Sequence, residues 1–245
     1  MPVSVSDLYR TLLDAFGHQD WWPMDHAYHQ TNGTDPREEI VIGAVLTQNT
    51  AWTNVEKALA NLKAAHALSF SSLISLDEDR LRRLIQPTGF YNQKAQRLRL
   101  VARALNGQLN AFFRQDLPQA RERLLALNGI GPETADSILL YAGNLPSFVV
   151  DAYTKRLCLR LPLPVSSESY EIIQQYFEGE LTQTFPGQEV TVYKELHALI
   201  VECAKTYCRV SPVCDGCPLR ERCQQAFKLG TQRLRRDIRQ GDQLR

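Results

Sequence analysis

Asp151 lies at a position where its carboxylate could cap a helix, take part in a reaction, or do both. Asp151 follows the apolar run "SFVV" and precedes "AYTKRLCLRL", an unusual place for a surface charge. In the structural interpretation, Asp151 caps the N-terminus of the helix that follows. In the chemical interpretation, its carboxylate lies in a cleft between two helical layers, stabilises a cationic sugar and orients or deprotonates water. The two interpretations are compatible.

Four closely spaced cysteines form a second group with chemical potential. Cys208, Cys214, Cys217 and Cys223 are separated by five, two and five residues, and Cys203 lies just upstream. In a cytosolic chain, clustered cysteines indicate a metal more often than disulfides. Four thiolates suit Zn²⁺ or an iron–sulfur cluster equally by their spacing, and four thiols without metal are the third alternative. Four protein ligands would close the coordination sphere, so we expect a structural site.

A glycine-containing turn, "LNGIGPETA", precedes Asp151 by one predicted helix. Gly129 and Gly131 can adopt positive φ and allow close backbone approach, and Pro132 suits the first position of a helix. The N–H groups at such a helix start can bind a DNA phosphate without reading sequence. Two glycines alone are equally typical of an ordinary inter-helix turn, so the order of turn, helix and Asp151 carries the argument.

The elements that position these residues are predicted to be helices, because apolar residues recur every three or four positions along most of the chain. The clearest apolar faces are Val55, Leu59 and Leu62; Ala95, Leu98, Val101, Ala102 and Leu105; and Ala135, Ile138, Leu139 and Ala142. Turn-forming segments such as "GTDP", "PTG" and "GNLP" separate them, and "SFVVDAY" is a single short β-like run. We therefore predict an all-α fold.

Composition limits the classes of protein to consider. The chain has 245 residues, 44% of them hydrophobic and 22% charged, which suits one or two globular cores. It has neither a run long enough to span a membrane nor a signal-peptide pattern, so we expect a cytoplasmic protein without membrane contact. The net charge of +1 does not indicate nucleic acid, although six Lys/Arg residues from Lys228 onward could lie near phosphates or form a solvated end.

Several longer stretches, in order, make the pattern specific. They are "WWP", "GAVLTQNT", "PTGFYNQKAQRL" and "GIGPETADSILLYA", followed by Asp151 and the four cysteines. Over nearly the whole chain this pattern resembles the helix-hairpin-helix DNA glycosylases of the endonuclease III superfamily, and most closely their 3-methyladenine DNA glycosylase III branch. The resemblance implies a DNA-associated base-excision-repair enzyme that acts on double-stranded DNA with a damaged base. We expect it to be a monomer.

The resemblance also implies two helical domains flanking a DNA-binding groove. One is a six-helix barrel with the helix-hairpin-helix at 30–145; the other joins 1–29 to 146–245 and carries a [4Fe-4S] cluster in the loop 208–223. Resemblance thus favours iron–sulfur, with zinc as the alternative. The first gap is five residues where endonuclease III has six, which makes Cys203 an alternative ligand to Cys208. Members of the 3-methyladenine branch can lack the cluster.

By resemblance, Asp151 is the essential catalytic aspartate, while Gly129, Ile130 and Gly131 bind phosphate, often with a monovalent cation on their carbonyls. Bifunctional endonuclease III enzymes carry a lysine at the position of Glu133, and its amine forms a Schiff base and cuts the strand. Glu133 cannot do this, so we expect a monofunctional enzyme in which Asp151 assists hydrolysis by water. Glu133 itself could simply favour the first turn of a helix electrostatically.

Further residues receive roles from the same resemblance. Gln48 or Asn49 fills the hole left by the flipped nucleotide, and Phe90 forms an apolar wedge beside the opposite base. Trp21 and Trp22 are candidates to stack on the extruded base. Packing in the core is the alternative for Phe90 and for both tryptophans.

The substrate is less sharply indicated. Alkylated purines such as 3-methyladenine are favoured, because their glycosidic bonds are already weakened and the lyase lysine is missing. Glu38 aligns with a pocket aromatic of the alkyladenine enzymes, and Leu199 with a pocket lysine, so the pocket differs from theirs. Lys94 and Lys155 are other amines, away from the lyase position. The alternatives are an endonuclease III-like glycosylase and lyase on oxidised pyrimidines, and a non-catalytic DNA-damage-binding protein.

Overall fold

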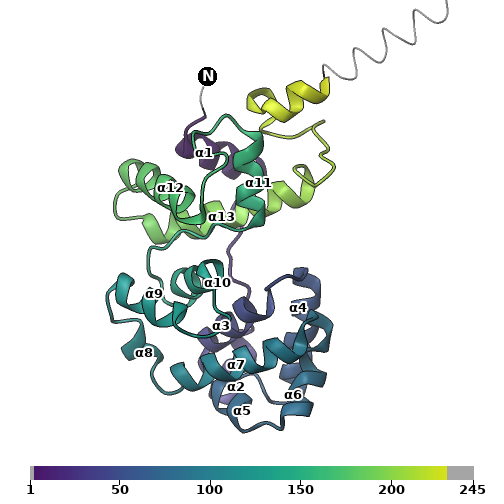
Figure 1. The fold of residues 1–245 in the computed structure, drawn as a ribbon, viewed down its shortest axis with the longest axis vertical. Helices are drawn as coiled ribbons and strands as arrows, with labels where there is room; N and C mark the ends of the chain where they lie inside the picture. Colours follow the sequence, from purple (N-terminus) through teal and green to yellow (C-terminus); the bar gives the residue numbers. More distant parts are fainter. Residues whose placement is uncertain (1–2, 231–245) are drawn as a thin grey trace, which may run out of the picture. The chain divides into compact units, whose positions relative to one another are not determined.

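The structure is a computed structural model that describes residues 3–230, and within them it contains helices and no strand. The predicted all-α class is confirmed. The basic residues from Arg233 onward lie outside the described residues. The chain divides into a central unit, Trp21–Ser147, and a terminal unit, which joins the residues up to Asp20 to those from Phe148 onward (Figure 1). None of the described helices is long and apolar enough to cross a membrane.

The central unit contains all the helices between the two terminal segments. They are α2 (His26–Asn32), α3 (Pro36–Leu46), α4 (Trp52–Ala64), α5 (Phe70–Ser75), α6 (Glu78–Ile85), the 3-10 turn η1 (Gln86–Thr88), α7 (Tyr91–Leu105), α8 (Leu109–Phe112), α9 (Leu117–Leu125), α10 (Pro132–Ser137) and the π-helical turn η2 (Ile138–Ala142). Aspartate carboxylates accept backbone N–H groups at the starts of α2, α3, α6 and α9, and these caps fix where the helices begin.

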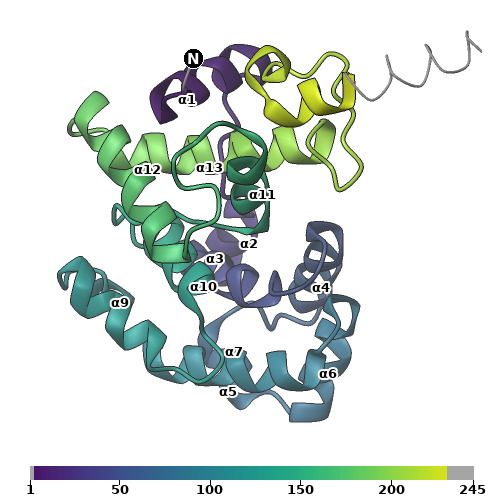
Figure 2. The ribbon, with the colours of Figure 1, turned by 45° about the horizontal axis from the view of Figure 1, so that its top comes forward.

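Helix α3 is the axis of the central unit. It is buried on all sides from Glu39 to Leu46, as expected of a helix that is apolar around its circumference, and it packs against α4, α7, α10 and η2. Its one buried charge, Glu39, is paired with His29 at 3.0 Å and Lys63 at 2.9 Å. Helix α7 contacts α3 and also α5 and α6 (Figure 2), so α7 connects the two ends of the unit.

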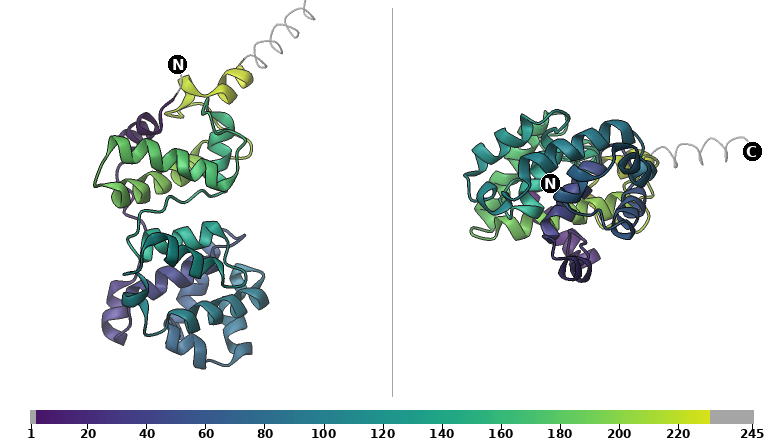
Figure 3. Two further views of the ribbon diagram at one scale, coloured as in Figure 1. Left: turned by 60° about the vertical axis from the view of Figure 1, so that its left-hand side comes forward. Right: turned by 90° about the horizontal axis from the view of Figure 1, so that it is seen from below.

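The terminal unit is built around α13. It contains α1 (Val5–Phe16), α11 (Ala152–Arg160), α12 (Tyr170–Thr184), α13 (Glu189–Thr206) and the 3-10 turn η3 (Arg220–Arg222). Helix α13 packs against α1, α11 and α12, and Figure 3 shows the purple α1 beside the green helices of the C-terminal half. Segments from opposite ends of the sequence therefore share one core.

The β-like run "SFVVDAY" does not form a strand, and its buried backbone bonds to side chains. The N–H of Phe148 donates to Glu178 of α12 at 2.8 Å, and the carbonyl of Phe148 accepts from Gln174 of the same helix at 2.7 Å. The polar groups of the extended chain are thereby satisfied without a partner strand, and the run leads directly to Asp151.

Candidate functional site

Asp151 combines the two roles that its sequence position suggests. It is the N-cap of α11, and its Oδ1 accepts hydrogen bonds from the backbone N–H of Thr154 at 2.7 Å and from Thr154 Oγ1 at 2.9 Å. The other oxygen, Oδ2, lies 3.6 Å from Nε2 of His197 on α13. Asp151 is 8% exposed and His197 5% exposed. The predicted cap is present, and both carboxylate oxygens are oriented.

The environment of Asp151 favours its charged form. Burial by itself raises the pKa of this carboxyl, but the adjacent imidazole of His197, with the two donors of Thr154, outweighs burial and leaves the pKa below its usual value. An ionised carboxylate at neutral pH suits a group that stabilises positive charge or accepts a proton, and not a general acid. Sequence reasoning missed His197; the available signal was a histidine amid the apolar residues of "ELHALIV".

In the central unit, the loop after α3 contacts the hairpin, which is the turn 129–131 between α9 and α10. The contact is made by Gln48. Its Nε2 donates to the carbonyl of Gly129 at 3.0 Å and to Thr134 Oγ1 at 2.9 Å, and its Oε1 accepts from Arg97 of α7 at 2.6 Å. The next residue, Asn49, is exposed and has a φ of 52°. The two sequence candidates for the same role are thus in different environments: Gln48 is held against the hairpin, and Asn49 is presented to solvent.

The two glycines of the hairpin serve different purposes. Gly129 has a φ of 83°, and a Cβ there would lie 2.2 Å from Nε of Arg97, so both conformation and space require glycine. Gly131 has a φ of −93° and is the N-cap of α10, with Pro132 following; a Cβ there would meet nothing within 4 Å. Of the two, only Gly129 uses the positive φ that sequence reasoning allowed for both. Between them, Ile130 is 5% exposed and belongs to the core.

Helix α10 is tied to α9 by a buried ion pair. Arg121 of α9 donates to both oxygens of Asp136, at 2.8 and 3.1 Å, and Ser147 Oγ donates to the same carboxylate at 2.7 Å. Asp136 is completely buried. Glu133 lies in the first turn of α10 and is exposed, where a negative charge is favoured by the helix dipole.

Phe90 is an exposed aromatic residue in an unfavourable backbone conformation. Its φ is 46°, it follows Gly89 with a φ of 65°, and its side chain is 64% exposed. A bulky residue in the left-handed region costs free energy, and such residues concentrate at functional sites. Packing in the core does not describe this side chain in the structure.

The two amines outside the lyase position differ in accessibility. Lys94 of α7 is 1% exposed, and its Nζ donates to the carbonyls of Leu46 at 2.9 Å and Thr88 at 2.7 Å. Burial, with a smaller effect of the Arg97 charge, lowers the pKa of Lys94 to about 8. Lys155 is exposed on α11, 5.8 Å from the ring centroid of Tyr170.

Trp22 is the centre of an aromatic group. Its ring lies 5.2 Å from Trp52, 5.1 Å from Tyr141 and 6.3 Å from Trp21, all edge-on. Gly43 of α3 gives it room, since a Cβ at Gly43 would lie 3.2 Å from the ring. The indole N–H of Trp22 is buried and has no hydrogen-bond acceptor among the described residues. A buried donor of this kind is available to an acceptor on a ligand.

Glu38 does not contact this aromatic group and instead bonds to the start of α5. Its Oε2 accepts from the backbone N–H of Phe70 at the start of α5, at 2.7 Å, and burial raises the pKa of its carboxyl. Glu38 and Gly43 are five positions apart on α3, which separates their side-chain directions by about 140°. The structure therefore assigns Glu38 to the packing of α3 against α5.

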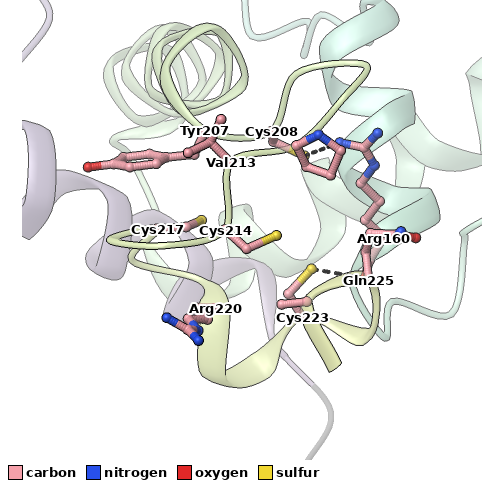
Figure 4. Close-up of a pocket in the computed structure, with 11 residues that line it drawn as sticks. Arg160, Tyr207, Cys208, Val213, Cys214, Cys217, Arg220, Cys223 and Gln225 are labelled. Atoms are coloured by element: carbon pink, nitrogen blue, oxygen red, sulfur yellow. Dashed lines mark hydrogen bonds between the residues drawn. The ribbon is translucent and has the colours of Figure 1, made fainter. Parts of the chain in front are cut away.

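The four predicted cysteine ligands border one pocket in the terminal unit. The pocket has a volume of about 280 Å³, counted with its opening to solvent, and is lined by Cys208, Cys214, Cys217 and Cys223 together with Arg160 (Figure 4). Arg160 donates from its guanidinium to Sγ of Cys208 at 3.2 Å, and Sγ of Cys223 donates to the carbonyl of Arg160 at 3.5 Å.

The four sulfurs do not form a preassembled metal site. Within residues 3–230 no three His, Cys, Asp or Glu side chains form a group that could hold a metal ion. The iron–sulfur cluster and its zinc alternative therefore stay predictions. Cys203 is fully buried and hydrogen-bonded to Cys217; this bond lowers the pKa of Cys217 to about 7, although burial opposes the effect.

The structure thus contains a hairpin between α9 and α10 that is bonded to Gln48, exposed side chains at Asn49 and Phe90, and a buried aspartate, Asp151, that caps α11. The chain belongs to the HhH-GPD superfamily of base excision DNA repair proteins, whose family model matches residues 42–183. It is therefore a base-excision-repair DNA glycosylase of this superfamily. The recognition of the family from sequence is confirmed.

Individual relatives agree with the family. A protein of Methanocaldococcus jannaschii with the provisional name of DNA repair glycosylase is 45% identical over 221 residues, which cover 88% of this chain and 94% of that protein. Endonuclease III of Sulfolobus acidocaldarius is 26% identical, covering 75% of this chain and 80% of that protein.

Solved structures support the fold. The 3-methyladenine DNA glycosylase of H. pylori bound to 1,N6-ethenoadenine has a TM-score of 0.65 and 26% identity, covering 83% of this chain and 98% of that one. An endonuclease III–DNA complex has a TM-score of 0.70 and 20% identity, covering 94% of this chain and 99% of that one, and supports the fold alone.

Proposed function

We propose that this protein is a monofunctional DNA N-glycosylase that extrudes a damaged base from double-stranded DNA and hydrolyses its N-glycosidic bond, with alkylated purines such as 3-methyladenine as the favoured substrates. The observation that carries the proposal is the buried carboxyl of Asp151, whose pKa is lowered. Glu133, in the first turn of α10, supports the monofunctional part of the proposal, because the family resemblance aligns it with the lyase lysine.

In the proposed reaction, Asp151 stabilises the positive charge that develops on the sugar and orients the attacking water. Its Oδ1 accepts hydrogen bonds from Thr154. We therefore assign the stabilisation of the sugar and the orientation of water to Oδ2, which lies beside His197. His197 acts through Asp151 as a positioning residue that keeps the carboxylate charged. The N-glycosidic bond breaks and its electron pair leaves with the base; the water forms the new bond to the anomeric carbon and gives a proton to Asp151, and an abasic site remains.

Strand cleavage would need an amine that attacks the sugar. A carboxylate at Glu133 cannot form a Schiff base. Lys94 is buried and donates to two backbone carbonyls, so its amine is not accessible to DNA. Lys155 is exposed on α11, away from the position that carries the lyase lysine in endonuclease III.

The DNA contacts of the proposal come from the central unit. Gly129, Ile130 and Gly131 bind a phosphate at the start of α10, and the open space at Gly131 supports this role; a monovalent cation on the hairpin carbonyls is part of the same proposal. Asn49 fills the hole left by the extruded nucleotide, and Phe90 inserts beside the opposite base. Such insertions offset the few kcal/mol that extrusion costs.

The proposed base pocket is formed by Trp21 and Trp22. Their rings offer stacking surfaces, and the buried N–H of Trp22 can donate to a ring acceptor of the base. Glu38 is left out of this pocket, because its carboxylate holds the start of α5. The H. pylori relative bound to ethenoadenine supports a modified purine as the ligand.

We also propose that Cys208, Cys214, Cys217 and Cys223 hold a [4Fe-4S] cluster in the terminal unit. When bound, the cluster supplies a structural cross-link between the loop and η3, with no role in the reaction. Zinc is the alternative, since four thiolates also suit that ion. We further propose that the protein is a monomer and that it associates with DNA in the cytoplasm.

A second candidate is an endonuclease III-like glycosylase with lyase activity on oxidised pyrimidines. The four cysteines, which the chain is proposed to share with endonuclease III, favour it. A non-catalytic DNA-damage-binding protein is the third candidate. It is eliminated if Asp151→Asn abolishes base release while DNA binding survives.

The experiment that tests the proposal is a panel of DNA duplexes, each with one alkylated or oxidised base, incubated with the purified protein. We expect base release from alkylated purines and strand cleavage only after alkali treatment. Release of oxidised pyrimidines with cleavage before alkali would support the second candidate, and no release from any duplex would contradict both enzymatic proposals.

A further inference from the structure

Two cations of helix α7, Lys94 and Arg97, contact the ends of three segments to which DNA contact is assigned above: the loop after α3, the loop after η1, and the hairpin. Lys94 bonds to Leu46, the last residue of α3, and to Thr88, the last residue of η1. Arg97 bonds to Gln48 and lies directly against Gly129 of the hairpin. The two side chains are three positions apart, so they lie on the same face of α7.

Lys94 joins the ends of two helices. The last carbonyls of a helix have no partner within it, and the negative end of the α3 dipole favours a cation there. Both helix ends lead within a few residues to an exposed side chain: Leu46 to Asn49, and Thr88 to Phe90. One ammonium group thus fixes the starting points of two exposed loops relative to each other.

Arg97 joins a third element to this pair. Its guanidinium donates to Oε1 of Gln48 at 2.6 Å, and Nε2 of Gln48 donates to Gly129 and Thr134 of the hairpin. The absence of a side chain at Gly129 lets the stem of Arg97 pass over the hairpin. The chain of contacts therefore runs from α7 through the loop after α3 to the hairpin.

Packing alone does not explain a buried ammonium at this place. Removing Lys94 from water is costly, and an apolar side chain of the same length would fill the space without that cost. The pKa of Lys94, lowered to about 8 mainly by burial, still leaves the ammonium as the main form at neutral pH. The charged form is the one that can donate to both carbonyls at once.

We propose that Lys94 and Arg97 are positioning residues for base extrusion. They hold three segments in the arrangement that contacts DNA: the loop of Gln48 and Asn49, the loop of Phe90, and the hairpin. This inference rests on the proposed function, since it assumes that these loops contact DNA. Neither cation needs to touch DNA or the reacting atoms. Their effect is to reduce the reorganisation that the loops would otherwise undergo on binding.

The test compares two substrates with the same lesion, one in a fully paired duplex and one in which the damaged base is opposite an abasic site. The second base is easier to extrude, because it has no pairing partner. The variants are Lys94→Met and Arg97→Gln, with Lys57→Met and Arg103→Gln as controls that remove the same charges from exposed positions on α4 and α7. Folding of each variant is checked by circular dichroism and thermal unfolding.

We expect kcat on the paired duplex to fall by about tenfold or more in each variant, the effect of losing one set of oriented hydrogen bonds. On the unpaired substrate the loss is expected to be much smaller, and the controls retain wild-type rates on both. Equal losses on the two substrates, or no loss, would overturn the proposal. If Lys94→Met does not fold, Arg97→Gln decides the question, because Arg97 is only half-buried.

A second readout separates this inference from the proposed function. A 2-aminopurine beside the lesion reports extrusion by fluorescence without any chemistry. If the wild-type protein raises this fluorescence but releases no base, the proposed function fails and the positioning role is still measured. If both cation variants extrude the base like the wild type, the positioning role fails while glycosylase activity stands.

Discussion

At the residue scale, the carboxylate of Asp151 is defined by its neighbours. Thr154 supplies two hydrogen bonds to one oxygen, and His197 lies against the other. These contacts overcome the effect of burial and keep the group ionised. A capping aspartate at the surface would have the same hydrogen bonds from Thr154. Burial and the neighbouring histidine are the features of Asp151 that support its proposed catalytic role.

Asp151→Asn is expected to reduce base release by about 10²–10³-fold or more, since the charge that stabilises the cationic sugar is lost. DNA binding should persist, and the stability of the fold should change little, because asparagine also caps helices. Single-turnover base release and a DNA-binding titration measure the two effects. Unchanged base release would show that Asp151 is only a cap.

Lys94 predicts a specific pH dependence of stability. Its pKa is about 8 in the folded state, against about 10.5 in the unfolded chain. Between these values the unfolded state binds more protons, so the free energy of unfolding contributed by this residue rises with pH, by about 3 kcal/mol at most. The difference in unfolding free energy between wild type and Lys94→Met should therefore increase from pH 8 to pH 10 in urea titrations. A constant difference would contradict the lowered pKa.

At the element scale, the hairpin depends on two glycines for different reasons. Gly129→Ala places a Cβ into Arg97 and keeps a φ of 83° that alanine disfavours, so it should cost about 1–3 kcal/mol of stability. Gly131→Ala is the matched control, since its φ is ordinary and the space around it is open. Urea unfolding of the two variants gives the comparison. A destabilisation by Gly131→Ala as large as that by Gly129→Ala would refute this explanation.

The helices and their caps are the part of the structure most accessible from the sequence. Apolar spacing gives the helical class, and aspartates such as Asp35 and Asp116 mark helix starts, because both effects are local along the chain. The cap role of Asp151 follows from the same logic. Resemblance, and not spacing, supplied the catalytic role.

Contacts between distant elements could not be predicted in this way. Gln48 and Asn49 were alternative candidates for the group that inserts into DNA, and sequence alone did not show that the amide of Gln48 is bound to the hairpin and to Arg97. Glu38 was expected in the base pocket and instead holds the start of α5. His197 was not expected to meet Asp151. Each depends on which helix faces come together, and periodicity does not specify that pairing.

At the scale of the whole molecule, the terminal unit joins the two ends of the chain around α13 and carries the cysteine pocket. Spacing and resemblance predicted that the four cysteines are metal ligands, and in the structure all four line one pocket. Cys203, the alternative ligand, is buried and hydrogen-bonded to Cys217.

The cluster proposal predicts a difference between cysteine variants. Cys214→Ala should lose the visible absorbance and most of the bound iron of anaerobically purified protein, because one thiolate ligand of the four is removed. Cys203→Ala should retain both, since Cys203 is not a proposed ligand. Loss of iron from Cys203→Ala with retention in Cys208→Ala would reverse the assignment of the first ligand, and stoichiometric zinc in place of iron would contradict the cluster.

The most direct test of the central claim uses wild-type protein on methylated duplex DNA and on abasic DNA. We predict that a methylated purine is released, that the strand is cut only after alkali, and that borohydride traps no covalent adduct with abasic DNA. We predict this result because Glu133, at the position that resemblance assigns to the lyase lysine, has no amine to form a Schiff base. A borohydride-trapped adduct, with strand cleavage before alkali, would contradict it and show that another amine of the chain forms the Schiff base.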